Sequence, residues 1–437
     1  MIVRPVPEGP DPALLLAHLG ADKEGFLLDG AFDPADEGAR SFLGLNAVAI
    51  VEPGGDALAG GCDALEAWCD RSAEGPDGGC PGPRAVGFVS YEAGRFVERV
   101  PLAPGPALSP DVRFAVYDAV YVHDHASKRA WIEADDARAA DRLDAAIRAP
   151  LPGLPDPPVV EAATSNMAEG AFRQMVQGAL ELIAAGEIYQ VNLAQRFRAK
   201  VSTGDAGAVP LYAQLRRAAP APFCGLLPHG DGHVLSLSPE RFLRWDPITH
   251  EIETRPIKGT RPRAADPRQD AALARELEGD AKERAEHLMI VDLERNDLGR
   301  VAVPGTVRVE GFSRLRALPR IHHLVSTVRA RTRDDVRLQD VLRATFPGGS
   351  ITGAPKVRAM EVIASMEPER RGVYTGALGH VDRRGGVDLA IAIRTAVLAK
   401  GELSFHVGGG IVADSDPERE RQETLTKAAA MLEACGG

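Results

Sequence analysis

The stretch Ile252-Glu-Thr-Arg-Pro-Ile-Lys-Gly-Thr-Arg-Pro-Arg263 contains an extended run that ends at Lys258, directly before a glycine. The chain that follows is rich in Ala, Glu and Arg and predicts a long helix over residues 269–294, with a turn at 296–299. Extended runs and helices alternate around this stretch. The early part of the sequence shows no strand followed by a glycine-rich turn and a helix, the unit that is typical of a dinucleotide-binding sheet. The pattern predicts an α+β fold with largely antiparallel strands.

Upstream of this stretch, residues 188–198 and 234–245 read as extended segments. Ser165-Asn166 has the residue types of a helix cap, and Gly186 has that of a helix end. The sequence therefore predicts a helix that begins after this pair and stops before the glycine.

The chain of 437 residues is long enough for two or three domains. Residues 1–150 read as a strand-rich region, with short β-type runs separated by Gly, Pro and Asp. Residues 151–164 are Pro-rich and give the strongest linker signal in the chain. Residues 165–432 then form the second region, in which most of the candidate functional residues lie.

The charge and composition of the chain indicate which classes of binding partner to expect. The chain carries 51 Lys and Arg against 62 Asp and Glu, a formal charge of −11, which argues against nucleic acid or an anionic membrane as its partner. No apolar run approaches the ~20 residues of a membrane span, and no signal peptide opens the sequence. The five cysteines lack metal-site spacing and fit reduced thiols in a cytoplasmic protein.

Two pairs of glutamates have helical spacing. Glu283 and Glu286 lie three residues apart, and Glu420 and Glu423 repeat that spacing after an expected N-cap at Asp416. Four converging carboxylates would suit Mg²⁺, which prefers oxygen ligands. From spacing alone, the ordinary interpretation is a solvated helix face stabilised by ion pairs such as Glu423 with Lys427.

Two glycine-rich segments, residues 346–356 and 406–412, leave backbone N–H groups open to an anion. The first is not a phosphate-binding P-loop, and it opens an expected helix over 356–366 whose N-terminus favours a carboxylate. When each segment is read alone, a tight turn between a strand and a helix is the ordinary interpretation.

Among single residues, Lys258 and Glu240 are the strongest candidates for a catalytic role. A lysine in a pocket can supply a neutral amine nucleophile, and a carboxyl group with a raised pKa can act as a general acid. A surface charge and a helix-start residue are the ordinary alternatives.

Together these segments closely resemble the chorismate-utilising enzymes. The resemblance is dense over about residues 165–430 and weaker over 25–30 and 87–94. It implies a layered antiparallel β-sandwich flanked by helices, with the N-terminal region packed into the same unit. The matching segments, in chain order, are residues 186–192, 237–242, 255–262, 286–297, 323–326, 347–360 and 408–415.

Within that family, the lysine at position 258 makes the chain resemble the aminodeoxychorismate synthases. These are the members that form 4-amino-4-deoxychorismate. Anthranilate and isochorismate synthases are expected to carry a small residue, typically Ala, at this place. Gln190 supports the same resemblance. The members of the family that add water resemble one another in having a lysine base at this position, and glutamine cannot act as that base.

The resemblance also implies a mechanism. Chorismate binds with its ring carboxylate on Mg²⁺ and its pyruvyl carboxylate at Arg394 and Tyr374. Lys258 attacks ring C2, and Glu240 protonates the departing C4 hydroxyl group. Ammonia then attacks C4 and Lys258 leaves, which yields 4-amino-4-deoxychorismate, a precursor of p-aminobenzoate and folate.

The other site residues come from the same resemblance. Glu286 and Glu423 would hold Mg²⁺, with Glu283 and Glu420 contacting the ion directly or through water. His323 is expected as a catalytic residue near the C4 hydroxyl group. The expected substrate-binding residues are Gln190, Thr260, Ser350, Tyr374, Arg394, Gly408, Gly409, Gly410 and Lys427.

No cysteine segment resembles a glutaminase nucleophile, so the family implies a separate glutamine amidotransferase subunit that supplies ammonia. Two alternatives stay open, namely an anthranilate synthase component I and a catalytically silent binding or regulatory subunit. Two positions depart from the family pattern. Asp29-Gly30 replaces the Glu-Ser pair of tryptophan-regulated relatives, which argues against that regulation, and His380 replaces a more usual aromatic residue.

Overall fold

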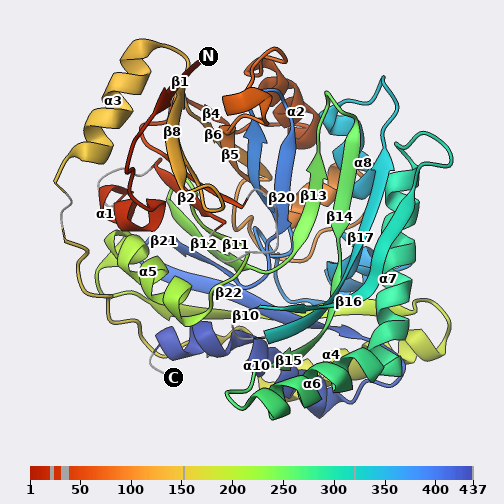
Figure 1. The fold of residues 1–437 in the computed structure, drawn as a ribbon. Coiled ribbons are helices and arrows are strands. Elements are labelled where there is room, and N and C mark those ends of the chain that lie inside the picture. Colours follow the sequence, from red (N-terminus) through yellow and green to blue (C-terminus); the bar gives the residue numbers. More distant parts are fainter. Residues whose placement is uncertain (20–23, 31–38, 151–152, 319–320, 436–437) are drawn as a thin grey trace.

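The computed structural model describes residues 1–19, 24–30, 39–150, 153–318 and 321–435. In these residues two large antiparallel sheets lie in the middle of the molecule, and helices lie around them (Figure 1). The α+β fold with layered antiparallel sheets is therefore confirmed. The first two residues of the expected linker, 151 and 152, lie outside the described residues. No helix within the described ranges is long and apolar enough to cross a membrane.

The first sheet has twelve strands, and all its neighbouring strands pair antiparallel. Its strands in spatial order are β1 (Ile2–Pro5), β8 (Arg129–Ala134), β7 (Ala119–Asp124), β3 (Arg40–Gly44), β2 (Phe26–Asp29), β11 (Phe223–Pro228), β12 (Gly232–Ser238), β21 (Thr395–Ala399), β22 (Glu402–Ile411), β10 (Gln190–Lys200) and β18 (Gly353–Ala354), with β9 (Thr164–Ser165) also paired to β10.

The second sheet has ten strands and is likewise antiparallel. Its strands in spatial order are β15 (Ile257–Pro262), β17 (Ile321–Arg331), β14 (Glu251–Arg255), β13 (Arg241–Trp245), β20 (Val387–Ile391), β19 (Ala377–Asp382), β5 (Pro83–Val89), β6 (Val112–Val116) and β4 (Ala49–Val51), with β16 (Arg308–Ala317) also paired to β17.

Helices cover the outside of the sheets (Figure 1). Among them, α7 packs on β15 and β17, and α10 packs on β22 and α4. The α-helices are α1 (Leu16–Leu19), α2 (Ala57–Ala67), α3 (Ala137–Arg148), α4 (Glu169–Ala184), α5 (Ala208–Ala218), α6 (Pro267–Gly279), α7 (Ala281–Gly299), α8 (Leu338–Thr345), α9 (Lys356–Met366) and α10 (Pro417–Ala434).

Both sheets combine strands from the two ends of the chain. In the first sheet β2 pairs with β11, and in the second β5 pairs with β19. A buried apolar cluster joins the sheets, with Phe26 and Val234 from the first and Phe88 and Leu378 from the second. Removing this apolar surface from water stabilises the sandwich as one unit.

The helix expected over residues 269–294 is two helices, so that prediction is wrong. Asp280 ends α6 and caps α7, because its side chain accepts hydrogen bonds from the N–H groups of Lys282 and Glu283. The turn expected at 296–299 is wrong too, since α7 continues to Gly299. Asp297 is buried there and pairs with Lys356, and such tertiary contacts override the local turn signal.

The upstream helix also begins later than expected. Ser165 belongs to β9, where it pairs with Phe197, and its hydroxyl group donates to Gln195. The helix α4 therefore starts at Glu169, although it ends before Gly186 as predicted. By contrast, α9 has the expected bounds, and Asp416 caps α10 as predicted.

Candidate active site

The extended run at 234–245 is two strands in different sheets. β12 lies in the first sheet and β13 in the second, and Glu240 lies between them where the chain crosses over. A second crossover, from β20 to β21, carries Arg394 with a positive φ of 49°. Backbone hydrogen bonds of 3.0 Å from Leu237 N to Arg394 O and from Ile391 N to Glu240 O hold the crossovers side by side. The fold thus brings the Glu240 carboxyl group and the Arg394 guanidinium group to neighbouring crossovers.

Lys258 lies near the start of β15, at an irregularity in the strand pairing. Lys258 pairs with Leu324 and Thr260 with His323, so the register shifts at Gly259, whose φ is 69°. A Cβ atom on Gly259 would lie 2.7 Å from Leu277 Cδ1, so glycine is required for both conformation and space. Lys258 is half-buried beside this bulge.

The glycines of β22 form a bare strip of backbone beside Lys258. A Cβ atom at Gly410 would lie 3.1 Å from Gln190 Nε2 and 3.6 Å from Lys258 Nζ. A Cβ atom at Gly408 would lie 2.9 Å from the Tyr374 hydroxyl group. The absence of side chains at these glycines lets Gln190, Lys258 and Tyr374 approach the strand backbone closely.

Gln190 is fully buried on β10, and neither polar atom of its side chain has a hydrogen-bond partner among the described residues. A buried unpaired amide is costly unless a ligand or water completes it. This unpaired amide lies beside Gly410, where a Cβ atom would be 3.1 Å from Gln190 Nε2.

Glu240 is placed to hold a proton at neutral pH. Burial raises the pKa of its carboxyl group to about 7. The Ser350 hydroxyl group, the Ile257 N–H group and the charges of Lys258 and Arg394 oppose this rise. The distance from Ile257 N to Glu240 Oε1 is 3.4 Å. A carboxyl group with this pKa is suited to general acid catalysis.

His323 lies on β17 and is buried. Its Nδ1 atom lies 3.1 Å from the Gly259 carbonyl oxygen, which can only accept, so Nδ1 carries the proton. Thr260 Oγ1 lies 3.0 Å from the same nitrogen. Burial, with a contribution from Arg394, lowers the pKa of His323 to about 4, so the ring is neutral. Nε2 is then a buried acceptor with no partner among the described residues.

Two further predicted binding residues lie around the same space. Tyr374 is buried and stacks on His406 with ring centroids 5.1 Å apart. Burial raises the pKa of Tyr374 well above its ordinary value, so its hydroxyl group stays a hydrogen-bond donor. Burial lowers the pKa of Arg394 and the nearby Glu240 charge opposes this, but a guanidinium group stays protonated.

The four predicted metal ligands lie on the two helices that flank the strip. Glu283 and Glu286 are on α7, and Glu420 and Glu423 are on α10. Burial raises the pKa of Glu283 and of Glu420, and the neighbouring carboxylate of each pair adds to the rise. Two like-charged pairs held in this way favour a bound cation.

Lysines neutralise these carboxylates in part. Lys427 Nζ lies 2.7 Å from Glu423 Oε1, and Lys282 Nζ lies 3.9 Å from Glu286 Oε1. Burial would raise the pKa of Glu423, but Lys427 first, and then Lys258 and Lys282, lower it. Within the described ranges no three His, Cys, Asp or Glu side chains are close enough together to hold a metal ion. The oxygen donors fit Mg²⁺ in kind, as two pairs rather than one cluster.

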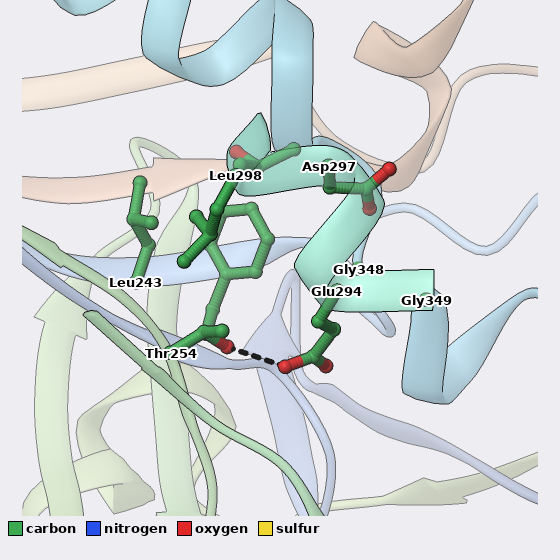
Figure 2. Close-up of a pocket in the computed structure, with 9 residues that line it drawn as sticks. Leu243, Thr254, Glu294, Asp297, Leu298, Gly348 and Gly349 are labelled. Carbon is green, nitrogen blue, oxygen red and sulfur yellow. Dashed lines mark hydrogen bonds between the residues drawn. The ribbon is translucent and has the colours of Figure 1, made fainter. Parts of the chain in front are cut away.

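A small cavity lies beneath the site, between α7 and the strands (Figure 2). Its volume is about 10 Å³, enough for one water-sized group and too small for a ring substrate. Glu294 points into it, and the Thr254 hydroxyl group donates to Glu294 Oε2 over 2.8 Å. Burial and the nearby Glu240 carboxylate raise the pKa of Glu294 well above its ordinary value.

Sequence reasoning missed Glu294. The signal was present, because Glu294 shares a helical face with the buried residues Ile290, Val291, Asp297 and Leu298. A carboxyl group on a buried helix face needs a hydrogen-bonding partner or a bound proton. A glutamate at this spacing is therefore a candidate functional residue.

The two departures from the family pattern have structural roles in this chain. Asp29 is buried and pairs with Arg216 and with the Ser41 hydroxyl group. His380 lies on β19, where its ring packs against Phe42 with centroids 5.4 Å apart.

Comparisons with known proteins fit this geometry. Residues 46–433 match the model of a family described as chorismate binding enzyme. Anthranilate synthase component 1 of Streptomyces coelicolor is 42% identical over 97% of this chain and 86% of its own length. Aminodeoxychorismate synthase component 1 of Salmonella typhimurium is 44% identical over 78% of this chain and 74% of its own length.

A solved structure supports the same assignment. The crystal structure of anthranilate synthase component I from Streptococcus pneumoniae TIGR4 aligns with a TM-score of 0.79 at 30% identity. The alignment covers 90% of this chain and 92% of the other. With a family model that spans most of the sequence, relatives above 40% identity and a shared fold, the chain belongs to the chorismate-binding enzyme family.

Proposed function

We propose that this chain is an aminodeoxychorismate synthase component I, which converts chorismate and ammonia to 4-amino-4-deoxychorismate. The observation that carries the proposal is Lys258, whose amine lies at the glycine strip beside Gln190 and close enough to Glu240 to influence its pKa. The proposal assigns Lys258 as the nucleophile and Glu240 as the proton donor toward one bound substrate. This is the pair of groups that amination through an enzyme adduct requires.

In the proposed reaction, the free amine of Lys258 forms a bond to ring C2 of chorismate. The ring double bond shifts as the C4–oxygen bond breaks, and Glu240 gives its proton to the departing hydroxyl group, which leaves as water. Ammonia then bonds to C4 and passes one proton to Glu240, the double bond shifts back, and the Lys258–C2 bond breaks, which restores the Lys258 amine. The buried Glu240, with a pKa of about 7, is partly protonated at neutral pH and can supply that proton.

The anchors of the substrate follow from the positions of the charges. Arg394 and Tyr374 would bind the pyruvyl carboxylate, because a guanidinium group and a neutral hydroxyl group both donate to a carboxylate. His323, neutral and with Nε2 free to accept, would take a hydrogen bond from the C4 hydroxyl group. Ser350 and the N–H groups of the glycine strip would complete the binding surface.

Mg²⁺ is the proposed cofactor. Glu286 and Glu423 would hold it, and Glu283 and Glu420 would contact it directly or through water. When bound, the ion neutralises the ring carboxylate and so helps the ring to accept an electron pair. Lys282 would have to move away from Glu286, since its ammonium group lies 3.9 Å from that carboxylate.

The proposed partner is a glutamine amidotransferase subunit that supplies ammonia. The relatives named component 1 support this, because a component 1 implies a second component. Free ammonium salt should replace the partner in a purified assay.

An anthranilate synthase component I is the second candidate. The Streptomyces coelicolor relative covers 97% of this chain, more than the aminodeoxychorismate synthase from Salmonella typhimurium does, at 78%. Both reactions would use the same carboxylates and the same substrate anchors. The difference is pyruvate elimination, which yields an aromatic product.

Product analysis separates the candidates. Purified protein is incubated with chorismate, Mg²⁺ and ammonium salt, and the products are identified by mass and by anthranilate fluorescence. 4-Amino-4-deoxychorismate without anthranilate supports the proposal, and anthranilate without an added lyase refutes it. Lys258→Ala is the matched variant, and absence of turnover by both proteins would instead indicate a silent subunit.

A further inference from the structure

Arg371 and Glu367 form a buried ion pair next to the glycine strip. Both residues are at most 3% exposed. Arg371 Nε donates to Glu367 Oε2 over 2.9 Å, and Nη2 donates to Glu367 Oε1 over 2.6 Å. Burial would lower the pKa of Arg371, but Glu367 raises it above its ordinary value. A buried pair costs desolvation that its own attraction often fails to offset, so its other contacts show its role.

The first set of contacts holds β10, the strand beside the glycine strip. Arg371 Nη2 donates to the Asn192 carbonyl oxygen over 2.8 Å. Glu367 Oε1 accepts from the Ala194 N–H group over 2.9 Å. In the strand register Asn192 lies opposite Gly410 and Ala194 lies opposite Gly408. The ion pair therefore contacts β10 at the residues that pair with the glycine strip.

The second set of contacts reaches the other substrate anchors. Arg371 Nη1 donates to the Ile351 carbonyl oxygen over 3.3 Å and to Thr375 Oγ1 over 3.1 Å. Ile351 directly follows Ser350, and Thr375 directly follows Tyr374. The guanidinium group also lies 5.6 Å from the centre of the Tyr374 ring. One cation therefore contacts three separate segments that carry expected ligands of chorismate.

We propose that Arg371, oriented by Glu367, is a positioning residue that sets the spacing of the glycine strip, Ser350 and Tyr374 around the substrate. The inference rests on the proposed function, which assigns these three elements to chorismate. Arg371 touches no substrate in this account and acts through the groups that it holds. Rigid support of this kind matters because a misplacement of about 1 Å far from the chemistry can cost about 10²-fold in rate.

The test is the double variant Arg371→Met, Glu367→Leu, because removing both charges avoids leaving one buried charge unpaired. We expect a cooperative thermal transition and far-ultraviolet circular dichroism like those of the wild type. We expect kcat/KM for chorismate to fall about 10²-fold. A folded double variant with wild-type kcat and KM would overturn the proposal.

Arg84→Met is the matched control. Arg84 is also buried and also donates to two backbone carbonyl oxygens, those of Trp68 and Tyr117. It contacts none of the three substrate-binding segments in the described structure. We expect it to lower the melting temperature without changing kcat/KM for chorismate, and a fall in kcat/KM as large as that of the double variant would contradict a specific role for Arg371.

Thr375→Val keeps the test decisive if the double variant does not fold. It removes only the hydroxyl group that joins Arg371 to the Tyr374 backbone, where Thr375 Oγ1 donates to the Tyr374 carbonyl oxygen over 2.6 Å. We expect a variant that still unfolds cooperatively and has a several-fold higher KM for chorismate, and an unchanged KM in the folded variant would overturn the proposal. Chorismate consumption is the readout, so an unexpected product would refute the proposed function and leave this test intact.

Discussion

The carboxyl group of Glu240 is proposed to donate a proton in catalysis, and its ionisation also affects the stability of the fold. The variant Glu240→Gln, which cannot ionise, tests both effects. Burial raises the pKa of this carboxyl group from 4.5 to about 7. A carboxyl group with a higher pKa in the folded state binds its proton more tightly when folded. Its contribution to stability is therefore fully present below about pH 4.5 and is lost as the pH rises through about 7.

The size of the effect follows from the shift. A difference of about 2.5 pKa units corresponds to about 3 kcal/mol of unfolding free energy at 1.36 kcal/mol per unit, and Glu240 is buried enough for this conversion to apply. Glutamine has the same shape and does not ionise. We therefore expect Glu240→Gln to abolish turnover and to raise the unfolding free energy by up to about 3 kcal/mol at pH 8.5, relative to its effect at pH 4.5.

The assay is urea unfolding of both proteins at several pH values from 4.5 to 8.5. Glu278→Gln is the matched control, because Glu278 is exposed on α6 and its substitution should leave the pH dependence unchanged. A stability difference between Glu240→Gln and the wild type that does not grow with pH would refute the reasoning. A wild-type rate that stays constant from pH 6 to pH 9 would also contradict Glu240 as the proton donor.

Two other variants test the binding groups. Glu286→Gln should raise the Mg²⁺ concentration for half-maximal rate about tenfold or more, since one charged ligand contact is worth about 1.5–3 kcal/mol; an unchanged Mg²⁺ titration would contradict the metal assignment. Arg394→Gln should raise the KM for chorismate about 10- to 100-fold, because it removes charge-assisted hydrogen bonds to a carboxylate. If instead only kcat falls and KM is constant, Arg394 does not bind the ground-state substrate.

Local signals in the sequence predicted some elements correctly, and the misses have two different causes. Asp416 followed by Pro417 is a complete N-terminal signal, and α10 begins there. The bounds of α9 were likewise predicted.

Two breaks were missed although a local signal was present. Gly279 favours a helix end and Asp280 a helix start, and these residues separate α6 from α7. Pro239 interrupts the run at 234–245, where the chain passes from one sheet to the other. The turn expected at 296–299 is wrong for another reason, because the distant contact between Asp297 and Lys356 lies within a continuing helix.

The candidate site was predicted residue by residue through family resemblance, and the structure adds how the residues meet. Spacing alone favoured a solvated helix face over a metal site for the glutamate pairs. The adjacency of Gln190, Lys258 and Gly410 depends on pairing between β10 and β22, which are far apart in the chain.

Glu294 was missed because its direct neighbours in the chain include charged residues. The apolar residues Ile290, Val291 and Leu298 at helical spacing were the available signal of a buried face.

The net charge of −11 describes the molecule as a whole and does not describe the charges at the site. Lys258 and Arg394 are near enough to influence Glu240, and Lys258 also influences Glu283 and Glu423. With Mg²⁺ bound to the glutamate pairs, as proposed, these two cations would offset the acidic surroundings for a substrate with two carboxylates. The overall acidic balance excluded nucleic acid as an expected partner without excluding an anionic substrate.

The covalent step at Lys258 is the central claim, and mass spectrometry of the protein tests it most directly. The wild-type protein is incubated with chorismate and Mg²⁺ without ammonia, then quenched in acid and digested. The account predicts a peptide containing Lys258 that is heavier by the mass of chorismate less one water, and no such adduct in Lys258→Ala. Turnover with ammonia by a Lys258→Ala variant at the wild-type rate, or an adduct on another residue alone, would contradict it.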